Sequence, residues 1–273
     1  MSGVSFGGPP LGGHHADVRR LRSLLRDRNA READGVFVCE GPRVISAALD
    51  QGVRLIEIFV GADASVTAKA VAERAERADV DVRVLAPGVA AKVGATTTPQ
   101  GVFAIAWRPR TGIAALAGAE LCVVAPLITD PGNAGTLIRS AAAAGASIIV
   151  LGPRSVDAYN PKVVRASAGA CFAVQILEGV PAMEVMEALG DAGVNRVGAV
   201  ASGGRAPEQV DLRVPTAIVV GHEARGLDFG GLDSELPLDE LVTIPMHATE
   251  SMNVAMAGTV LLYEAARQRR TRA

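Results

Sequence analysis

Three turns in the sequence bring together residue types that could bind a ligand and act on it. The first spans residues 129–139 and holds two glycines, Asn133 and, six positions later, Arg139. The glycines let a ligand approach the backbone closely, and the start of the following helix offers free N–H groups to an anion. Asn133 can also simply cap that helix, so the turn alone supports a structural interpretation as well as a chemical one.

The other two turns follow later strands. Gly221 ends one strand, and Glu223 falls where a helix could begin, a position that helix-dipole complementarity alone would explain. In the third turn Ser251 begins the last helix and is its expected N-cap, while Asn253 lies in the first turn of an otherwise apolar helix. His247, in the loop before that helix, is a candidate general base, although loop histidines are usually only solvated.

The elements that position these turns alternate between strand and helix from residue 120 onward. Short β-branched runs separated by helical segments predict an α/β domain with a parallel sheet and helices on both faces. Ligands of such sheets bind beyond the carboxyl ends of the strands, where the three turns lie. Neither GxxxxGK(S/T) nor GxGxxG occurs, which argues against a nucleotide-triphosphate loop, NAD or a glycine-loop methyltransferase. The expected strands are 121–128, 147–151, 173–177, 196–200, 217–220 and 241–244, and the expected helices are 135–144, 161–168, 182–192 and 251–268.

The N-terminal part of the chain predicts a smaller α/β unit. Its segment 17–31 has apolar residues at helical spacing and more arginines than acids, which fits either a solvated surface helix or a contact for a polyanion. Asp63 is the expected cap of a helix over 63–78. The other expected elements are a helix from Pro42 to about residue 50, a turn over 96–101, and strands 36–39, 55–60, 82–85 and 102–107. The predicted division is a leader over 1–16, an N-terminal domain over 17–107, a linker over 108–117 and a C-terminal domain over 118–273.

The composition narrows the class of protein further. With 49% hydrophobic and 3% aromatic residues, the 273-residue chain must build its core from aliphatic side chains. The 27 basic and 29 acidic residues give a net charge of −2, which excludes a uniformly cationic coat for nucleic acid but not a local basic patch. All but three of the basic residues are arginine, whose planar guanidinium can bind a phosphate through two hydrogen bonds, unlike the ammonium of lysine.

The cysteines and the lengths of the apolar runs indicate where in the cell the protein is expected. Cys39, Cys122 and Cys171 are widely spaced and lie among apolar residues, so they are expected to be buried thiols of a cytoplasmic protein. The N-terminal residues lack the charged-then-apolar order of a signal peptide. No apolar run reaches about 18 residues, so no membrane span is expected.

In this order and spacing the three turns closely resemble the signature motifs of the SpoU family of RNA ribose 2′-O-methyltransferases, within the SPOUT superfamily. The resemblance covers about residues 120–268. The N-terminal unit, with residues 40–43, resembles the substrate-binding domain that many members carry. The matching positions are Asn133 with Arg139, the segment 160–170, the run Gly-His-Glu-Ala-Arg-Gly-Leu at 221–227, the run Ile-Pro-Met at 244–246, and the run Ser-Met-Asn-Val at 251–254.

The resemblance implies a fold, a cofactor and an oligomer. Family members bind S-adenosylmethionine in a deep C-terminal trefoil knot, a rare exception to unknotted topology, so the missing glycine loop is expected. They are dimers in which the first-motif arginine lies near the partner's active site. No metal is needed, because the sulfonium of S-adenosylmethionine is already activated. The residues expected to hold the cofactor are Val200, Ala201, Gly221, Ile244, Ser251 and Met252.

The implied reaction is attack of a ribose 2′-hydroxyl on the methyl group of S-adenosylmethionine. The counterpart of Arg139 is usually given the role of proton acceptor, but a guanidinium has a pKa above ~12 and donates rather than accepts. A phosphate clamp that also orients the hydroxyl fits its chemistry better, and its role stays open. The other residues expected at the catalytic site are Asn133, Glu223, Ser251 and Asn253, and those expected to bind RNA are Arg19, Arg20, Arg22, Arg43, Lys162 and Arg165.

The substrate follows only by association from the attached N-terminal domain. We expect structured RNA, with 23S ribosomal RNA favoured over transfer RNA. A non-catalytic RNA-binding or ribosome-assembly protein on the same fold is the alternative from another class, and the intact motif residues argue against it. A small-molecule enzyme with a nucleotide cofactor is disfavoured, since neither nucleotide fingerprint occurs.

Overall fold

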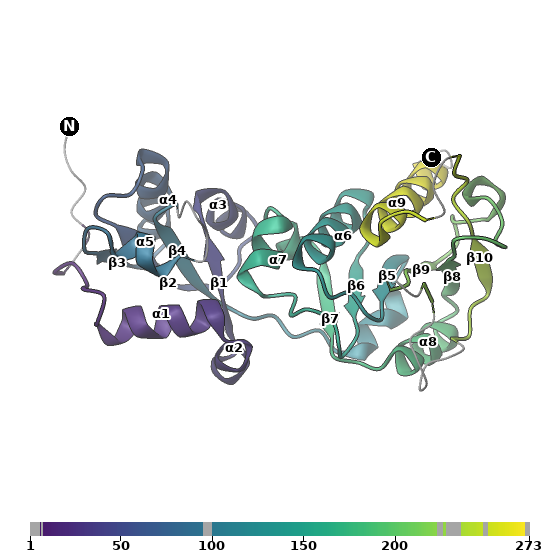
Figure 1. The fold of residues 1–273 in the computed structure, drawn as a ribbon, viewed down its shortest axis with the longest axis horizontal. Helices are drawn as coiled ribbons and strands as arrows, with labels where there is room; N and C mark the ends of the chain where they lie inside the picture. Colours follow the sequence, from purple (N-terminus) through teal and green to yellow (C-terminus); the bar gives the residue numbers. More distant parts are fainter. Residues whose placement is uncertain are drawn as a thin grey trace. The chain divides into compact units, whose positions relative to one another are not determined.

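The computed structural model describes residues 6, 8–94, 100–222, 226–227, 236–247 and 251–270. The chain forms two compact units (Figure 1). The N-terminal unit consists of Met1–Pro109 with Tyr159–Phe172, and the C-terminal unit of Arg110–Ala158 with Ala173–Ala273. The sequence-based boundaries assign the segment 159–172 to the C-terminal domain. By its contacts the segment belongs to the N-terminal unit, because the ring centroids of Tyr159 and Phe37 are 4.9 Å apart and Arg165 pairs with Glu40.

The N-terminal unit is built on a four-stranded sheet in the order β1-β4-β2-β3. Strand β4 is antiparallel to β1 and β2, and β3 is parallel to β2. Each strand expected in this part of the sequence is present. The elements are α1 (Ala16–Arg26), α2 (Arg28–Asp34), β1 (Val36–Glu40), α3 (Pro42–Asp50), β2 (Leu55–Gly61), α4 (Val66–Glu76), β3 (Asp81–Leu85), α5 (Val89–Val93), β4 (Val102–Trp107), α7 (Pro161–Ala166) and η2 (Ala170–Phe172).

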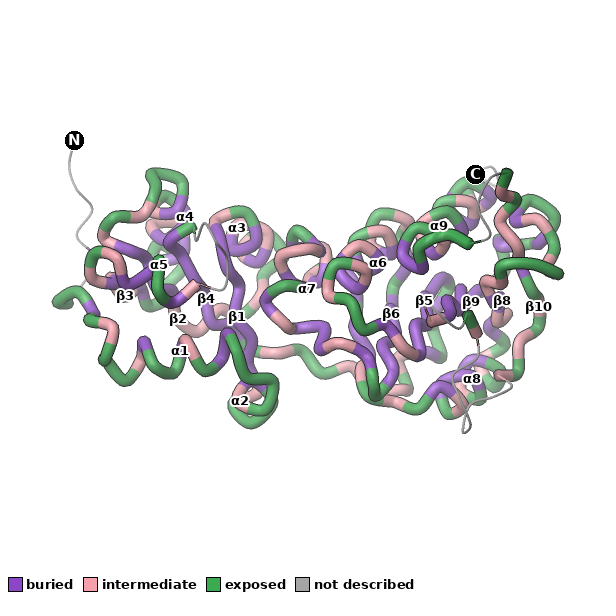
Figure 2. Tube along the Cα trace, viewed as in Figure 1, coloured by how far each residue is buried: buried purple, intermediate pink, exposed green. Residues whose placement is uncertain are grey.

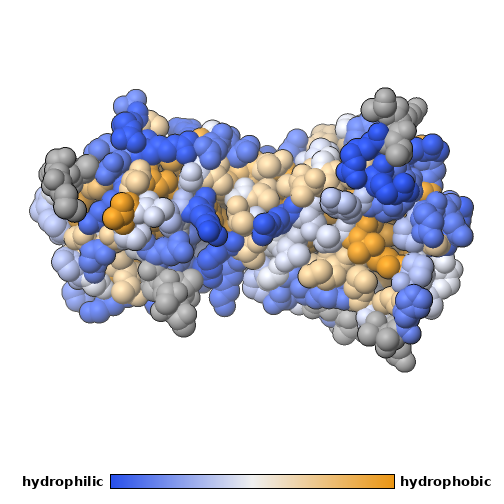
Figure 3. Space-filling model, turned by 90° about the horizontal axis from the view of Figure 1, so that it is seen from above, coloured by the Kyte–Doolittle hydropathy of each residue, from blue (hydrophilic) through white to orange (hydrophobic). Residues whose placement is uncertain are grey.

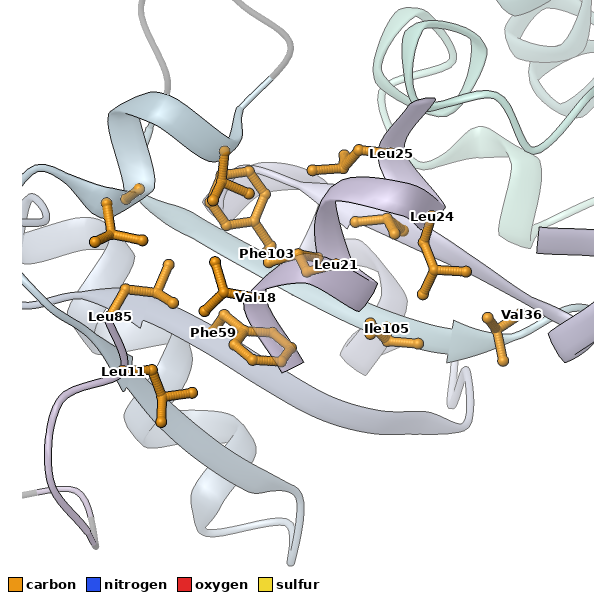
Figure 4. Close-up of a cluster of buried hydrophobic side chains, with 14 residues drawn as sticks. Leu11, Val18, Leu21, Leu24, Leu25, Val36, Phe59, Leu85, Phe103 and Ile105 are labelled. Carbon is orange, nitrogen blue, oxygen red and sulfur yellow. The ribbon is translucent and has the colours of Figure 1, made fainter. Parts of the chain in front are cut away.

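Helix α1 covers one face of this sheet with the apolar stripe that the sequence predicts. Val18, Leu21, Leu24 and Leu25 are buried in one cluster with strand residues such as Phe103 (Figure 4). Burying aliphatic and aromatic side chains of this size stabilises the fold by about 1.5–3 kcal/mol each. Packing of this apolar stripe on the sheet therefore stabilises α1 more than intrinsic helix propensity does.

Two predictions for the N-terminal unit are wrong at helix ends. The single helix over 17–31 is interrupted at Asp27, whose side chain accepts a hydrogen bond from the backbone N–H of Asn29 at 2.8 Å and starts a second helix. Arg31 is then only 2% exposed, and its Nη1 donates to the Leu24 carbonyl, so it cannot contact a polyanion. Ser65, not Asp63, caps helix α4.

The C-terminal unit contains a six-stranded sheet in the order β10-β8-β9-β5-β6-β7, with every pair parallel. The predicted α/β fold with a parallel sheet is confirmed. Helices α6 and α9 lie over one face and α8 over the other (Figure 1), so the central strands are buried along their length (Figure 2). The elements are η1 (Ile113–Gly118), β5 (Leu121–Ala125), α6 (Pro131–Ala144), β6 (Ile148–Leu151), β7 (Gln175–Glu178), α8 (Ala182–Asp191), β8 (Asn195–Ala199), η3 (Pro207–Gln209), β9 (Thr216–Val219), β10 (Glu240–Val242) and α9 (Val254–Arg270).

Strand β10 is enclosed by the chain that leaves β8. It pairs with β8 on one edge, and on the other edge Arg205 forms a parallel bridge with Val242. The Arg205 N–H donates to the Leu241 carbonyl and the Thr243 N–H to the Arg205 carbonyl, both at 2.9 Å. Residues 200–205 thus pass from one side of β10 to the other. This crossing is consistent with the trefoil knot that the family resemblance implies.

Helices α6 and α9 pack closely because a glycine lies between them. A Cβ atom at Gly258 would lie 2.5 Å from Leu137 Cδ1, so no larger residue fits without displacing a buried leucine. The Ser140 and Thr259 hydroxyls are 2.7 Å apart one residue further along. None of the described helices is long and apolar enough to cross a membrane.

Candidate active site

A cavity of about 360 Å³ lies at the carboxyl ends of three adjacent parallel strands, β10, β8 and β9, beside the start of α9. All six residues that the sequence predicts for the cofactor line it. They are Val200, Ala201, Gly221, Ile244, Ser251 and Met252. Each comes from a turn that follows a strand or precedes α9, so the parallel order of the sheet brings together residues far apart in the chain.

Backbone forms much of the cavity wall. The Val200 N–H donates to the Val242 carbonyl at 2.9 Å, which holds the ends of β8 and β10 together. After β9, His222 and Gly226 exchange two backbone hydrogen bonds. A Cβ atom at Gly221 would lie 2.3 Å from the backbone of Gly226. Only glycine fits at this point, because a side chain would collide with the backbone of Gly226.

Two asparagines connect the first and third turns. Asn253 Nδ2 donates to Asn133 Oδ1 at 3.0 Å, and Asn253 Oδ1 accepts from the N–H groups of Ala255 and Met256. Asn253 therefore caps α9, and the prediction that Ser251 is the N-cap is wrong. The N-cap of α6 is Asp130, which accepts from the Asn133 N–H at 2.8 Å. The side-chain amide of Asn133 accepts the hydrogen bond from Asn253, just before α9.

Arg139 does not line the cavity of its own chain. It is exposed on α6, and no described residue forms a hydrogen bond or an ion pair with it. Six residues turn the helix by about 240°, so Arg139 and Asn133 point to different sides of α6. His247 is exposed and is absent from the described lining of the cavity. Glu223 lies outside the described residues.

The cations of α1 that the sequence predicts for RNA differ in their availability. Arg19 is exposed. Arg20 forms ion pairs with Asp34 and Glu57, both at 3.0 Å, and Arg22 Nη1 donates to the Gly13 carbonyl at 2.7 Å. The pKa of Glu57 is raised by burial, and Arg20 opposes that shift. Two of the three arginines thus hold the unit together internally.

The other three cations lie on α3 and α7, also in the N-terminal unit. Lys162 and Arg43 are exposed. Arg165 Nη1 donates to Glu40 Oε2 at 2.9 Å. Arg43 and Arg165 line a second cavity, of about 300 Å³, which sequence reasoning did not anticipate.

Sequence reasoning also missed several residues of the first cavity. His222, Gly226 and Met246 belong to the runs 221–227 and 244–246 that carry the family resemblance, so a signal for them was present. Ala199, Val220 and Val242 lie at strand ends and could have been found from the topology. Among the described residues, no group of three or more His, Cys, Asp or Glu lies close enough to hold a metal ion.

The model of the SpoU rRNA methylase family matches residues 120–263, slightly more than half of the chain. The chain belongs to this family. The protein is therefore an RNA methyltransferase. A second family model, the MRM3-like substrate binding domain, matches residues 16–104.

Relatives of known sequence or structure agree with this membership. An uncharacterised tRNA/rRNA methyltransferase of Synechocystis is 31% identical over 92% of this chain and 90% of its own. The SpoU methyltransferase AviRb of Streptomyces viridochromogenes, solved in complex with AdoMet, is 30% identical with a TM-score of 0.80, over 94% of this chain and all of that one. A solved RNA 2′-O ribose methyltransferase is 28% identical with a TM-score of 0.77, over 96% of this chain and 100% of its own.

The cap at Asn253 can be tested by thermodynamics. Asn253→Ala removes the acceptor for two N–H groups, and we expect it to lower the free energy of unfolding by about 1 kcal/mol in urea titrations. Asn253→Asp keeps that acceptor and should cost less. Ser251→Ala is the control, with an expected change within about 0.5 kcal/mol. If Ser251→Ala lowered the free energy of unfolding as much as Asn253→Ala, the cap would be assigned to the wrong residue.

Proposed function

We propose that this protein transfers the methyl group of S-adenosylmethionine to a ribose 2′-hydroxyl of structured RNA, with 23S ribosomal RNA favoured over transfer RNA. The observation that carries the proposal is the convergence of all six predicted cofactor residues on one cavity next to the Asn133–Asn253 pair. The AdoMet complex of AviRb and the solved 2′-O ribose methyltransferase support it, as does the substrate binding domain matched at 16–104.

The residues of the cavity suit S-adenosylmethionine. Val200, Ile244 and Met246 offer aliphatic surface for the adenine ring, and the strand ends offer backbone groups for polar edges. The bare backbone at Gly221 lets a ligand approach where a side chain would not fit. The described lining also includes the side chains of His222 and Ser251, which can form hydrogen bonds with polar groups of the cofactor. When bound, the cofactor supplies a methyl group activated by a sulfonium.

The chain's own polar residues orient the acceptor. Asn253 is held by the first turn of α9 and Asn133 by Asn253, so both amides keep a fixed position beside the cavity. The exposed Ser251 lies at the cavity itself. Arg139 has five N–H donors and no acceptor, so we assign it the phosphate next to the target ribose rather than the proton of the 2′-hydroxyl. Glu223 is proposed to position the loop after β9.

The active form is proposed to be a homodimer in which Arg139 serves the partner's cavity. Met256, Val260 and Tyr263 recur on one side of α9 and are 51%, 40% and 62% exposed. An apolar stripe of this kind next to the site is suited to being covered by a second copy. Apolar areas also interrupt the hydrophilic surface of the C-terminal unit on the face drawn in Figure 3.

We place the protein in the cytoplasm, where thiols stay reduced. All three cysteines are free and buried, as the sequence predicts. Burial raises the pKa of Cys122 to about 12 and that of Cys171 to about 11, so both stay protonated at physiological pH.

Methyl transfer is the direct test of the proposed reaction. The full-length protein is incubated with methyl-labelled S-adenosylmethionine and either ribosomal or transfer RNA. We expect label in ribosomal RNA, at a nucleotide whose 3′-phosphodiester resists alkaline hydrolysis, since a 2′-O-methyl group removes the attacking hydroxyl. Label on a base, or in no RNA, would refute the reaction, and label in transfer RNA alone would refute the choice of substrate.

Mixed dimers test the role of Arg139. Arg139→Ala leaves the cavity intact and Gly221→Val blocks it, and we expect each variant alone to lose nearly all transfer. Arg139→Ala should keep its affinity for S-adenosylmethionine in calorimetry. Co-expressed and purified together, the two variants should regain part of the wild-type activity, because one complete site forms per mixed dimer. No recovery, with mixed dimers shown to be present, would mean that Arg139 acts in its own chain or not at all.

A further inference from the structure

The N-terminal unit contains a cavity that the proposed methyl transfer does not use. It has a volume of about 300 Å³, and its lining includes Glu40, Gly41, Arg43, Gln100 and Arg165. A second hollow, of about 660 Å³, also includes Arg43 and Gln100 and extends to Ser65 and Thr67 at the start of α4. Arg43 and Gln100 therefore lie where the two hollows meet. We call this pair of hollows the α3 cavity.

An ion pair between buried Glu40 and partly exposed Arg165 fixes one wall of the α3 cavity. The Glu40 side chain is 3% exposed and that of Arg165 is 36% exposed, with Nη1 and Oε2 2.9 Å apart. The two residues come from β1 and α7, which are 125 positions apart in the chain. Gly169, just after α7, packs so closely on α3 that a Cβ there would lie 2.5 Å from Ala47 Cβ. The segment that carries Arg165 is thus held in one place.

The described contacts of Arg165 leave most of its donors available. A guanidinium has five N–H donors, and within the described part of the chain only Nη1 has a partner. Because Glu40 is buried and holds one nitrogen, it orients the guanidinium without enclosing it.

Arg43 adds a second cation at the same cavity. It is exposed in the first turn of α3, and no described residue forms a hydrogen bond or an ion pair with it. Within the described residues no side chain caps the start of α3, where Gly41 has φ 96°. Two guanidiniums next to an uncapped helix start favour a phosphate.

Gln100 supplies the polar group that a base would need. A Cβ at Gly41 would lie 2.8 Å from Gln100 Oε1, so the glycine makes room for the amide over the start of α3. An amide carries a donor and an acceptor and can pair with the edge of a base. A concave cavity of this size suits a small ligand and cannot admit a stacked duplex.

We propose that the α3 cavity binds one unpaired nucleotide of the RNA substrate, with its phosphate on Arg43 and Arg165 and its base next to Gln100. The inference rests on the proposed function, because it assumes that the substrate is RNA. It adds that the N-terminal unit recognises a single-stranded element rather than only the backbone of a helix.

Binding of labelled RNA to the full-length protein tests this inference without methyl transfer. The probes are a short mixed-sequence single-stranded RNA and a duplex of the same sequence, measured by fluorescence anisotropy. Arg43→Ala removes a cation, and Gln100→Trp fills the cavity without changing the charge. We expect each variant to bind the single strand about tenfold more weakly, as for loss of a charge-assisted or buried contact. Arg43→Ala should also reduce the slope of log K against log salt by about 0.7.

Arg77→Ala is the matched control, since Arg77 is exposed in the same unit and lines neither hollow. It should change the affinity little, and duplex binding should be the same for all four proteins. Equal single-strand affinities for wild type, Arg43→Ala and Gln100→Trp would overturn the inference, as would a wild type that binds no single strand. Binding of free nucleoside monophosphates but not of the oligonucleotide would also overturn it, in favour of a site for free nucleotides. Methyl transfer by the wild type is assayed separately and tests the proposed function independently of the result for RNA binding.

Discussion

Strand β10 is held on both of its edges, and the architecture of the C-terminal site depends on that enclosure. On one edge β8 supplies a parallel ladder, and on the other Arg205 bonds to Leu241 and Thr243. Gly204 has no room for a side chain, because a Cβ would lie 2.7 Å from the carbonyl carbon of Val242. The turns after β8 and β10 must therefore lie side by side. Their residues face one cavity as a consequence.

The remaining wall comes from the packing of α9 on α6. Gly258 lets the two helices approach, and the Ser140–Thr259 contact and the Asn133–Asn253 hydrogen bond lie along the same contact. Because closely packed helices have little freedom to shift, the packing of α9 on α6 fixes the start of α9 relative to the sheet. The polar residues of the site thus sit on a packed core rather than on independent loops.

The alternation of strands and helices was enough to predict the sheet of the C-terminal unit, since buried parallel strands have a distinctive composition. The family resemblance that the motif residues carry was enough to predict which turns meet. Caps were harder to predict, because several capping side chains lie within three residues of a helix start, as with Asp130 and Asn133 or Ser251 and Asn253. Only packing distinguishes them. The pairing of Glu40 with Arg165 and the burial of Arg31 depend on contacts between distant segments, so no local pattern reveals them.

The central claim is that S-adenosylmethionine occupies the cavity at the ends of β8, β9 and β10. Hydrogen exchange of the full-length protein, followed by mass spectrometry with and without the cofactor, tests it most directly. The claim predicts slower exchange in the segments 199–201, 220–222, 242–246 and 251–257, which line the cavity, and no change around Arg43 and Gln100. Binding without protection of those four segments, or protection confined to the N-terminal unit, would contradict it.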